Sequence, residues 1–101
     1  MTEQHKPRYV TRAINGELNI EIQVLLWELL DSIAVSRKDK MDYLQVFEIV
    51  NSGNKLKITN RQEQPAMKKE LIIESTLEIK DTTVWIINEP NYQTMLFPSD
   101  Y

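Results

Sequence analysis

The sequence contains no cysteine among its 101 residues. Disulfides, thiolate nucleophiles and cysteine zinc sites are therefore excluded. The single histidine, His5, lies near the N-terminus, so a histidine-based triad or zinc site lacks its side chains. Glycine occurs only at positions 16 and 53, which excludes a Gly-rich phosphate loop. We predict no catalytic residues, no metal site, no cofactor and no enzymatic activity.

Long apolar runs are also missing. Apolar runs such as residues 24–27 are far too short to span a membrane, and the N-terminal "MTEQHKPRYV" has no apolar signal-peptide core. The net charge of −3 gives no bulk attraction to nucleic-acid phosphates. With the missing cysteines, these features predict a cytoplasmic protein. We expect a flexible tail at 1–7 and a single domain at 8–101.

Residues 18–33 carry the strongest local pattern. At a step of about 100° per residue, six apolar residues share one helix face. They are Leu18, Ile22, Leu25, Leu26, Leu29 and Ile33. Asn19 is a suitable N-cap, Glu21 places negative charge in the first turn, and the cations of residues 37–40 follow the other end. The pattern predicts one helix of about four to five turns with one buried face.

The rest of the chain has the alternating apolar pattern of strands. The expected strands are 8–14, 42–50, 55–61, 70–80, 84–88 and 92–97. Residues 42–50 are apolar on both alternating faces, which indicates a central strand, and "NSGN" at 51–54 is typical of a tight turn. We therefore expect an α+β fold, with an antiparallel sheet of five to six strands and one long helix packed across one face.

The polar stretch 59–70, "TNRQEQPAMKKE", lies between two expected strands. Its candidate contact residues are Arg61, Gln62, Glu63, Gln64 and Pro65. Their side chains offer donors and acceptors of several kinds, and the proline interrupts strand pairing. Two interpretations remain open. The stretch is either a wide hairpin connection, in which Arg61 pairs with a carboxylate such as Glu48, or a partner-binding site.

Two aromatic residues outside this loop are further candidates for partner binding. Trp27 lies about 180° from Leu18 on the predicted helix, away from the core face. Either a terminal segment covers it, or it belongs to a homodimer or partner surface. Tyr43, at the start of the expected central strand, is the second candidate.

Charged residues suggest two other surfaces. Lys55, Lys57 and Arg61 alternate outward on one strand and form a basic face on which neighbouring tyrosines would stack single-stranded bases. Glutamates at positions 70, 74 and 78 form an outward row, which is either a solvated face or a site for a divalent cation or a basic partner. The function we predict is that of a non-enzymatic accessory protein that binds a protein partner or forms a homodimer. The alternative is a nucleic-acid-binding accessory protein.

Four phrases in this order resemble one known family: "RYVTR", "DYLQVFE", "NRQEQP" followed by "KKE", and "YQTMLFPSDY". The chain is similar over residues 8–101 to domain of unknown function 960, small proteins of Gram-positive bacteria that also occur on staphylococcal cassette elements. The resemblance implies a cytosolic bacterial protein and suggests, as a hypothesis, a link to mobile genetic elements. It assigns no catalytic residue or ligand.

Overall fold

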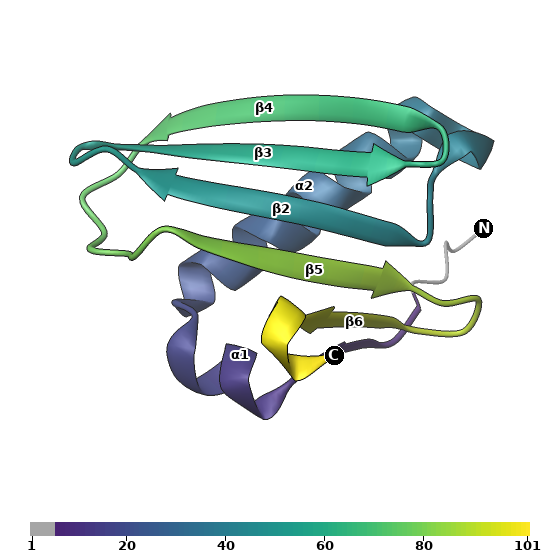
Figure 1. Cartoon of the computed structure of the whole chain (residues 1–101), viewed down its shortest axis with the longest axis horizontal. Helices are drawn as coiled ribbons and strands as arrows, with labels where there is room; N and C mark the ends of the chain where they lie inside the picture. The colour runs from purple at the N-terminus through teal and green to yellow at the C-terminus, as the bar shows by residue number, and fades with distance from the viewer. Residues whose placement is uncertain (1–5) are drawn as a thin grey trace, which may run out of the picture.

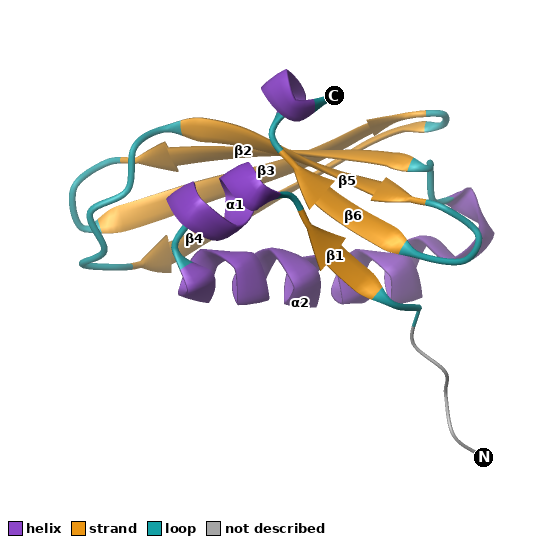
Figure 2. Ribbon diagram, turned by 90° about the horizontal axis from the view of Figure 1, so that it is seen from below, coloured by secondary structure: helices purple, strands orange, loops and turns teal. Residues whose placement is uncertain are grey.

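One long helix lies across one face of a six-stranded sheet (Figures 1 and 2). The computed structural model describes residues 6–101. Its elements are β1 (Arg8–Val10), α1 (Arg12–Glu17), α2 (Ile20–Arg37), the 3-10 turn η1 (Lys38–Lys40), β2 (Leu44–Asn51), β3 (Lys55–Glu63), β4 (Ala66–Glu74), β5 (Thr82–Asn88), β6 (Gln93–Leu96) and the 3-10 turn η2 (Pro98–Asp100). The predicted α+β fold is confirmed.

The strands are ordered β1-β6-β5-β2-β3-β4. β2 is central, as predicted, and pairs antiparallel with both β3 and β5. The sheet is mixed rather than wholly antiparallel, because β1 runs parallel to β6. Strands joined by short turns pair antiparallel, whereas these two come from opposite ends of the chain and no short turn fixes their direction.

The helix α2 forms where the apolar pattern predicted it. The side chain of Asn19 accepts a hydrogen bond from the backbone N–H of Glu21 at 2.7 Å, which satisfies one free donor of the first turn. The buried face includes Ile22, Leu26 and Ile33. These side chains pack on the buried residues of the central strands, such as Phe47 and Ile58. Within residues 6–101, no helix has the length and apolar character needed to cross a lipid bilayer.

The first predicted strand is wrong beyond Val10, because residues 12–17 form the helix α1. The hydroxyl of Thr11 accepts a hydrogen bond from the backbone N–H of Ile14 at 3.2 Å, as an N-cap does. Ile14 is fully buried in the core. The helix replaces the strand because it buries Ile14 while its cap satisfies the first turn.

The prediction of a wide polar loop is also wrong. β3 continues to Glu63 and β4 begins at Ala66, so only Gln64 and Pro65 form the turn. The Gln64–Pro65 peptide bond is cis. β4 ends at Glu74, and residues 75–81 are irregular, so the predicted glutamate row does not extend to position 78.

Candidate functional site

The sheet face opposite α2 has no layer of secondary structure over most of its area, and we call it the open face. Figure 1 views this face with α2 behind the sheet, and Figure 2 shows the C-terminal turn η2 on its side. Strand pairing arranges its residues in rows across the sheet. Residues of the open face include Tyr9, Val46, Glu48, Val50, Lys57, Arg61, Lys68, Glu70, Ile72 and Trp85.

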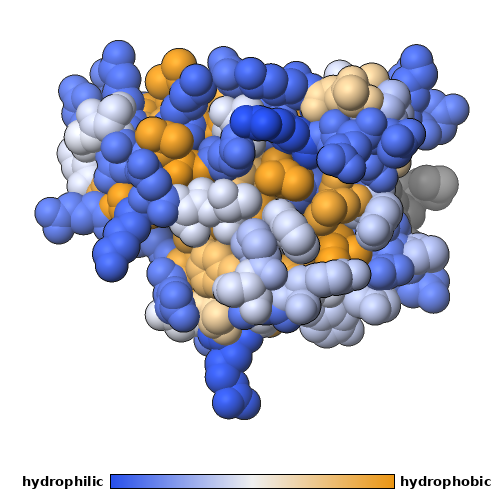
Figure 3. Space-filling view, viewed as in Figure 1, coloured by the Kyte–Doolittle hydropathy of each residue, from blue (hydrophilic) through white to orange (hydrophobic). Residues whose placement is uncertain are grey.

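Apolar and aromatic side chains remain accessible across the open face. Val50 is 45% exposed and Ile72 is 61% exposed, and both lie opposite Lys57 in neighbouring strands. At the opposite edge of the sheet, where β1 lies, the rings of Tyr9 and Tyr92 meet edge to face, with centroids 6.0 Å apart. Figure 3 shows hydrophobic residues between hydrophilic ones over the middle of this face. Tyrosine and apolar side chains that share one uncovered face are typical of a protein interface.

The C-terminus covers only part of this face. The ring of Tyr101 packs edge to face on that of Trp85, with centroids 5.8 Å apart. The carboxylate of Asp100 accepts a hydrogen bond from the Thr11 hydroxyl at 2.8 Å, which holds η2 against the start of α1. The C-terminal segment is therefore docked over β5, and the strands β2, β3 and β4 stay free of it.

Charged residues of the open face form pairs of opposite sign. Arg61 donates to Glu48 at 2.6 Å, as the pairing interpretation predicted. The ammonium groups of Lys57 and Lys68 each lie 3.4 Å from the carboxylate of Glu70. These two cations lower the pKa of Glu70 below its ordinary value, with Lys57 the larger cause. The charges of the face over β2, β3 and β4 therefore largely offset one another, because Arg61 has Glu48 beside it and Lys57 and Lys68 share Glu70.

The structure places the predicted loop residues at one end of the β3–β4 hairpin. Glu63, Gln64 and Pro65 are exposed there. The carboxylate of Asp42 accepts hydrogen bonds from the backbone N–H groups of Glu63 at 3.3 Å and of Gln64 at 3.0 Å. Tyr43 is 60% exposed beside the same end. These four residues therefore share one edge of the molecule.

Gln62 differs from its neighbours in the chain. It is only 4% exposed, and its side chain lies on the helix side of the sheet. Its Oε1 accepts hydrogen bonds from Arg37 Nη1 at 3.0 Å and from Gln45 Nε2 at 2.7 Å. Its Nε2 donates to the backbone carbonyl of Lys40 at 2.7 Å and to that of Pro65 at 2.9 Å. Gln62 therefore joins the end of α2, the β2 strand and the turn after β3.

One further buried polar side chain, Asn60, completes this cluster, which we call the amide cluster: Arg37, Gln45, Asn60 and Gln62. Gln45 Oε1 accepts hydrogen bonds from Arg37 Nη1 at 3.2 Å and from Asn60 Nδ2 at 3.0 Å. Asn60 Oδ1 has no hydrogen-bond partner among the described residues. Our sequence reasoning missed the cluster, although Asn60 and Gln62 share the parity of the buried Leu56 and Ile58.

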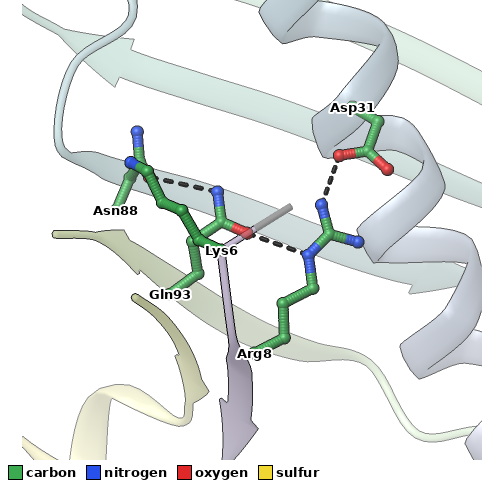
Figure 4. Close-up of polar contacts among 5 residues, drawn as sticks. All are labelled: Lys6, Arg8, Asp31, Asn88 and Gln93. Atoms are coloured by element: carbon green, nitrogen blue, oxygen red, sulfur yellow. Dashed lines mark hydrogen bonds and ion pairs between the residues drawn. The ribbon is translucent and has the colours of Figure 1, made fainter. Parts of the chain in front are cut away.

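Trp27 lies on the helix side, far from the hairpin turn in the fold. The guanidinium carbon of Arg8 lies 4.8 Å from the centroid of its ring, so β1 partly covers the ring, as one interpretation predicted. Arg8 also donates to Asp31 on α2 and, through Nε, to Gln93 Oε1 at 2.9 Å (Figure 4). Trp27 thus packs beneath the N-terminal strand.

Lys6 extends the contacts around β1 (Figure 4). Its ammonium group donates to Asn88 Oδ1 at 2.9 Å and to the backbone carbonyl of Glu89 at 2.8 Å. The predicted tail therefore contains at least two residues with tertiary contacts, because the Pro7 carbonyl also accepts from the Gln93 N–H at 3.0 Å. Residues 1–5, including His5, lie outside the described residues.

The predicted surfaces therefore do not form one site. The open face and the hairpin turn are continuous through Arg61, whereas Trp27 lies across the sheet from them. In residues 6–101, the aspartate and glutamate side chains form no group of three suited to hold a metal ion.

Comparison with known proteins gives a family and a fold. The family model described as "Staphylococcal protein of unknown function" (DUF960) matches residues 7–100. A crystal structure of a protein of unknown function from Enterococcus faecalis superposes with a TM-score of 0.80 at 15% sequence identity, over 95% of this chain and 91% of that chain. No curated protein matches the chain. The family match covers nearly all of the chain and agrees with the phrases quoted above, so the chain belongs to the DUF960 family of staphylococcal proteins of unknown function.

Proposed function

We propose that this chain is a non-enzymatic accessory protein that binds a protein partner through its open face. The observation that carries this proposal is the sheet face left uncovered by α2, with Val50, Ile72 and Tyr9 exposed on it. A sheet that packs one face on its core usually presents polar side chains on the other. Val50 and Ile72 lie on either side of Lys57 in one row, and apolar side chains exposed on that second face favour contact with another apolar surface.

The charges on the open face favour a protein surface as the partner. Arg61 and Lys57 already have Glu48 and Glu70 beside them, so the face has little excess positive charge for a phosphate backbone to bind. A protein surface with an apolar centre and charges of both signs fits this arrangement better. We therefore expect binding that weakens only modestly as salt is raised.

A nucleic-acid partner is the second candidate, because tyrosines lie on the same sheet face as the basic residues. Tyr9 is 56% exposed and packs on Tyr92, which leaves ring surface for a base to stack. Binding of a single-stranded oligonucleotide that falls steeply with salt, and is lost in a Lys55→Glu and Lys57→Glu double variant, would support this candidate in place of the first.

The protein proposal is tested by site-specific photo-crosslinking in the bacterial cytoplasm, which is also the compartment that we propose. One chain has a crosslinking amino acid in place of Val50, which is 45% exposed on the open face. The control chain has it in place of Val24, which is 49% exposed on the outer side of α2. The two positions match in residue type and exposure and differ in the face that they occupy.

We expect a discrete protein adduct from position 50 and none from position 24. The adduct should disappear when Ile72→Glu is added, because Ile72 lies in the same row of the open face, and should persist with Val35→Glu on α2. An adduct of twice the chain mass identifies the partner as a second copy. Equal crosslinking at both positions, or adducts from position 24 alone, would refute the open face as the binding surface. The link to mobile genetic elements stays a hypothesis beside this proposal.

A further inference from the structure

A second surface with a distinct chemistry lies at the end of α2, beside the edge strand β4. A cavity of about 620 Å³ lies between residues 36–40, at the end of α2 and in η1, and Met67 and Lys68 at the start of β4. Its volume falls within the range of small-molecule sites. Arg37 forms one wall of this cavity and is itself part of the amide cluster.

Arg37 is a buried cation without a carboxylate partner. Its side chain is 8% exposed, and among residues 6–101 no carboxylate lies within ion-pair distance of it. Its Nη1 donates to the neutral oxygens of Gln45 and Gln62. Buried charges in proteins are normally paired, because removing an ion from water has a large free-energy cost. Desolvation accordingly lowers the pKa of Arg37, although arginine keeps its proton at neutral pH.

The hydrogen bonds of Arg37 leave part of its guanidinium group available. A guanidinium has five N–H donors in a planar fork. Within the described part of the chain, only Nη1 has protein acceptors, so Nε and Nη2 remain without a protein oxygen. In residues 6–101, Asn60 Oδ1 is the one fully enclosed side-chain nitrogen or oxygen without a hydrogen-bond partner, so Nε and Nη2 of Arg37 are not fully enclosed. Arg37 lines the cavity, which gives these nitrogens a way to contact a ligand bound there.

The charges around the cavity suit an anion. Lys38 and Lys40 contribute two cations beside Arg37, and Asp39 contributes one carboxylate, which leaves a surplus of two positive charges. Lys68 also lines the cavity, and its ammonium group lies 3.4 Å from Glu70, a carboxylate that it shares with Lys57. This surplus occurs in a chain whose net charge is −3.

We propose that this cavity binds a phosphate group, with Arg37 as the buried end of the site. A phosphate monoester has about two negative charges and three acceptor oxygens at neutral pH. The negative charge suits the positive surplus of the lining, and the phosphate oxygens suit the N–H donors of the Arg37 fork and of the lysines at 38 and 40. The cavity has room for more than a phosphate ion, so it can accept the phosphate group of a larger molecule, either a nucleotide or a phosphorylated peptide.

A purely structural role predicts a different behaviour. Cations at the end of a helix stabilise it through the helix dipole, and Lys38 and Lys40 follow α2 directly. If they do only this, their removal lowers stability without changing anion binding. Binding and stability are therefore measured on the same variants.

The probe is inorganic phosphate, titrated at constant ionic strength against chloride while the side-chain N–H signal of Arg37 is followed by NMR. We expect a saturable shift of this signal and of the backbone amides of residues 36–40. Lys38→Gln and Lys40→Gln should each raise the Kd about two- to fivefold. Arg37→Lys keeps the charge, loses the fork and should raise the Kd about tenfold.

The matched control is Lys55→Gln, an exposed lysine on β3 outside the cavity, which should leave the Kd unchanged. Shifts that are linear, equal with chloride, or equal in all variants would overturn the proposal. The lysine variants keep it testable if Arg37→Lys does not fold. Adenosine monophosphate and a phosphoserine hexapeptide then identify the remainder of the ligand, because the natural class should bind more tightly than phosphate alone.

Discussion

Replacement of Gln62 by leucine tests whether the polar stretch after β3 is part of the protein interior. Gln62 is 4% exposed, and its side chain accepts three hydrogen bonds and donates two. Leucine has a similar volume and none of these groups. The variant therefore removes the hydrogen bonds, while the leucine side chain still fills most of the space that the glutamine occupied.

The magnitude follows from the partners that lose their hydrogen bonds. Two of them, Arg37 Nη1 and Gln45 Nε2, are buried, and each keeps one hydrogen bond, to Gln45 Oε1 and to the Asp42 carbonyl respectively. The second N–H of each loses its partner, at a cost of about 1–3 kcal/mol. The backbone partners lie nearer the surface, where water replaces part of the loss. The buried leucine methyl groups regain some of this free energy. We expect the free energy of unfolding to fall by about 3 kcal/mol.

The assay is urea unfolding followed by tryptophan fluorescence, with circular dichroism for the thermal midpoint. For a chain of this size, the urea midpoint should fall by roughly 1.5–3 M, and Tm by roughly 12–24 °C.

The matched control is Gln64→Leu, two residues along the chain. Gln64 is exposed, and its described hydrogen bond runs from its backbone N–H to Asp42, so leucine should change the free energy of unfolding by less than about 0.5 kcal/mol. If Gln62→Leu has no larger effect than Gln64→Leu, the amide cluster does not contribute to stability and the reasoning fails.

Two further predictions concern the surface contacts. The pKa of Glu70 lies below its ordinary value because of Lys57 and Lys68. The contribution of this carboxylate to stability is therefore present above a pH of about 4.3 and is lost as the pH falls through the lowered pKa. NMR titration of the Glu70 carboxyl should give a higher pKa in Lys57→Ala, and an unchanged pKa would contradict the pairing. Arg8→Ala should uncover Trp27, so tryptophan emission should move to longer wavelength and acrylamide quenching should increase. Arg12 is an exposed arginine of α1, and Arg12→Ala should leave both unchanged. Equal quenching in the two variants would show that β1 does not cover the ring.

The sequence determined the main elements of the fold because their signals are local. The apolar positions of α2 recur with the period of a helix, and Asn19 caps it, so neither depends on distant residues. In β3, Leu56 and Ile58 alternate with lysines and are buried, as predicted. These periodicities also gave the order of one long helix followed by strands. They failed at residues 12–17, where the pattern was too short to separate a strand from a capped helix.

Only the tertiary structure decided which polar residues are surface and which are core. Gln62 and Gln64 are chemically identical and have the same strand parity, and they differ because Gln62 lies beneath the end of α2, whereas Gln64 lies in the turn beyond it. Arg37 has a helix-end position that normally faces water, yet it contacts two strands distant in the sequence. Burial of a polar group depends on the partners that the fold brings to it, and no local pattern contains them.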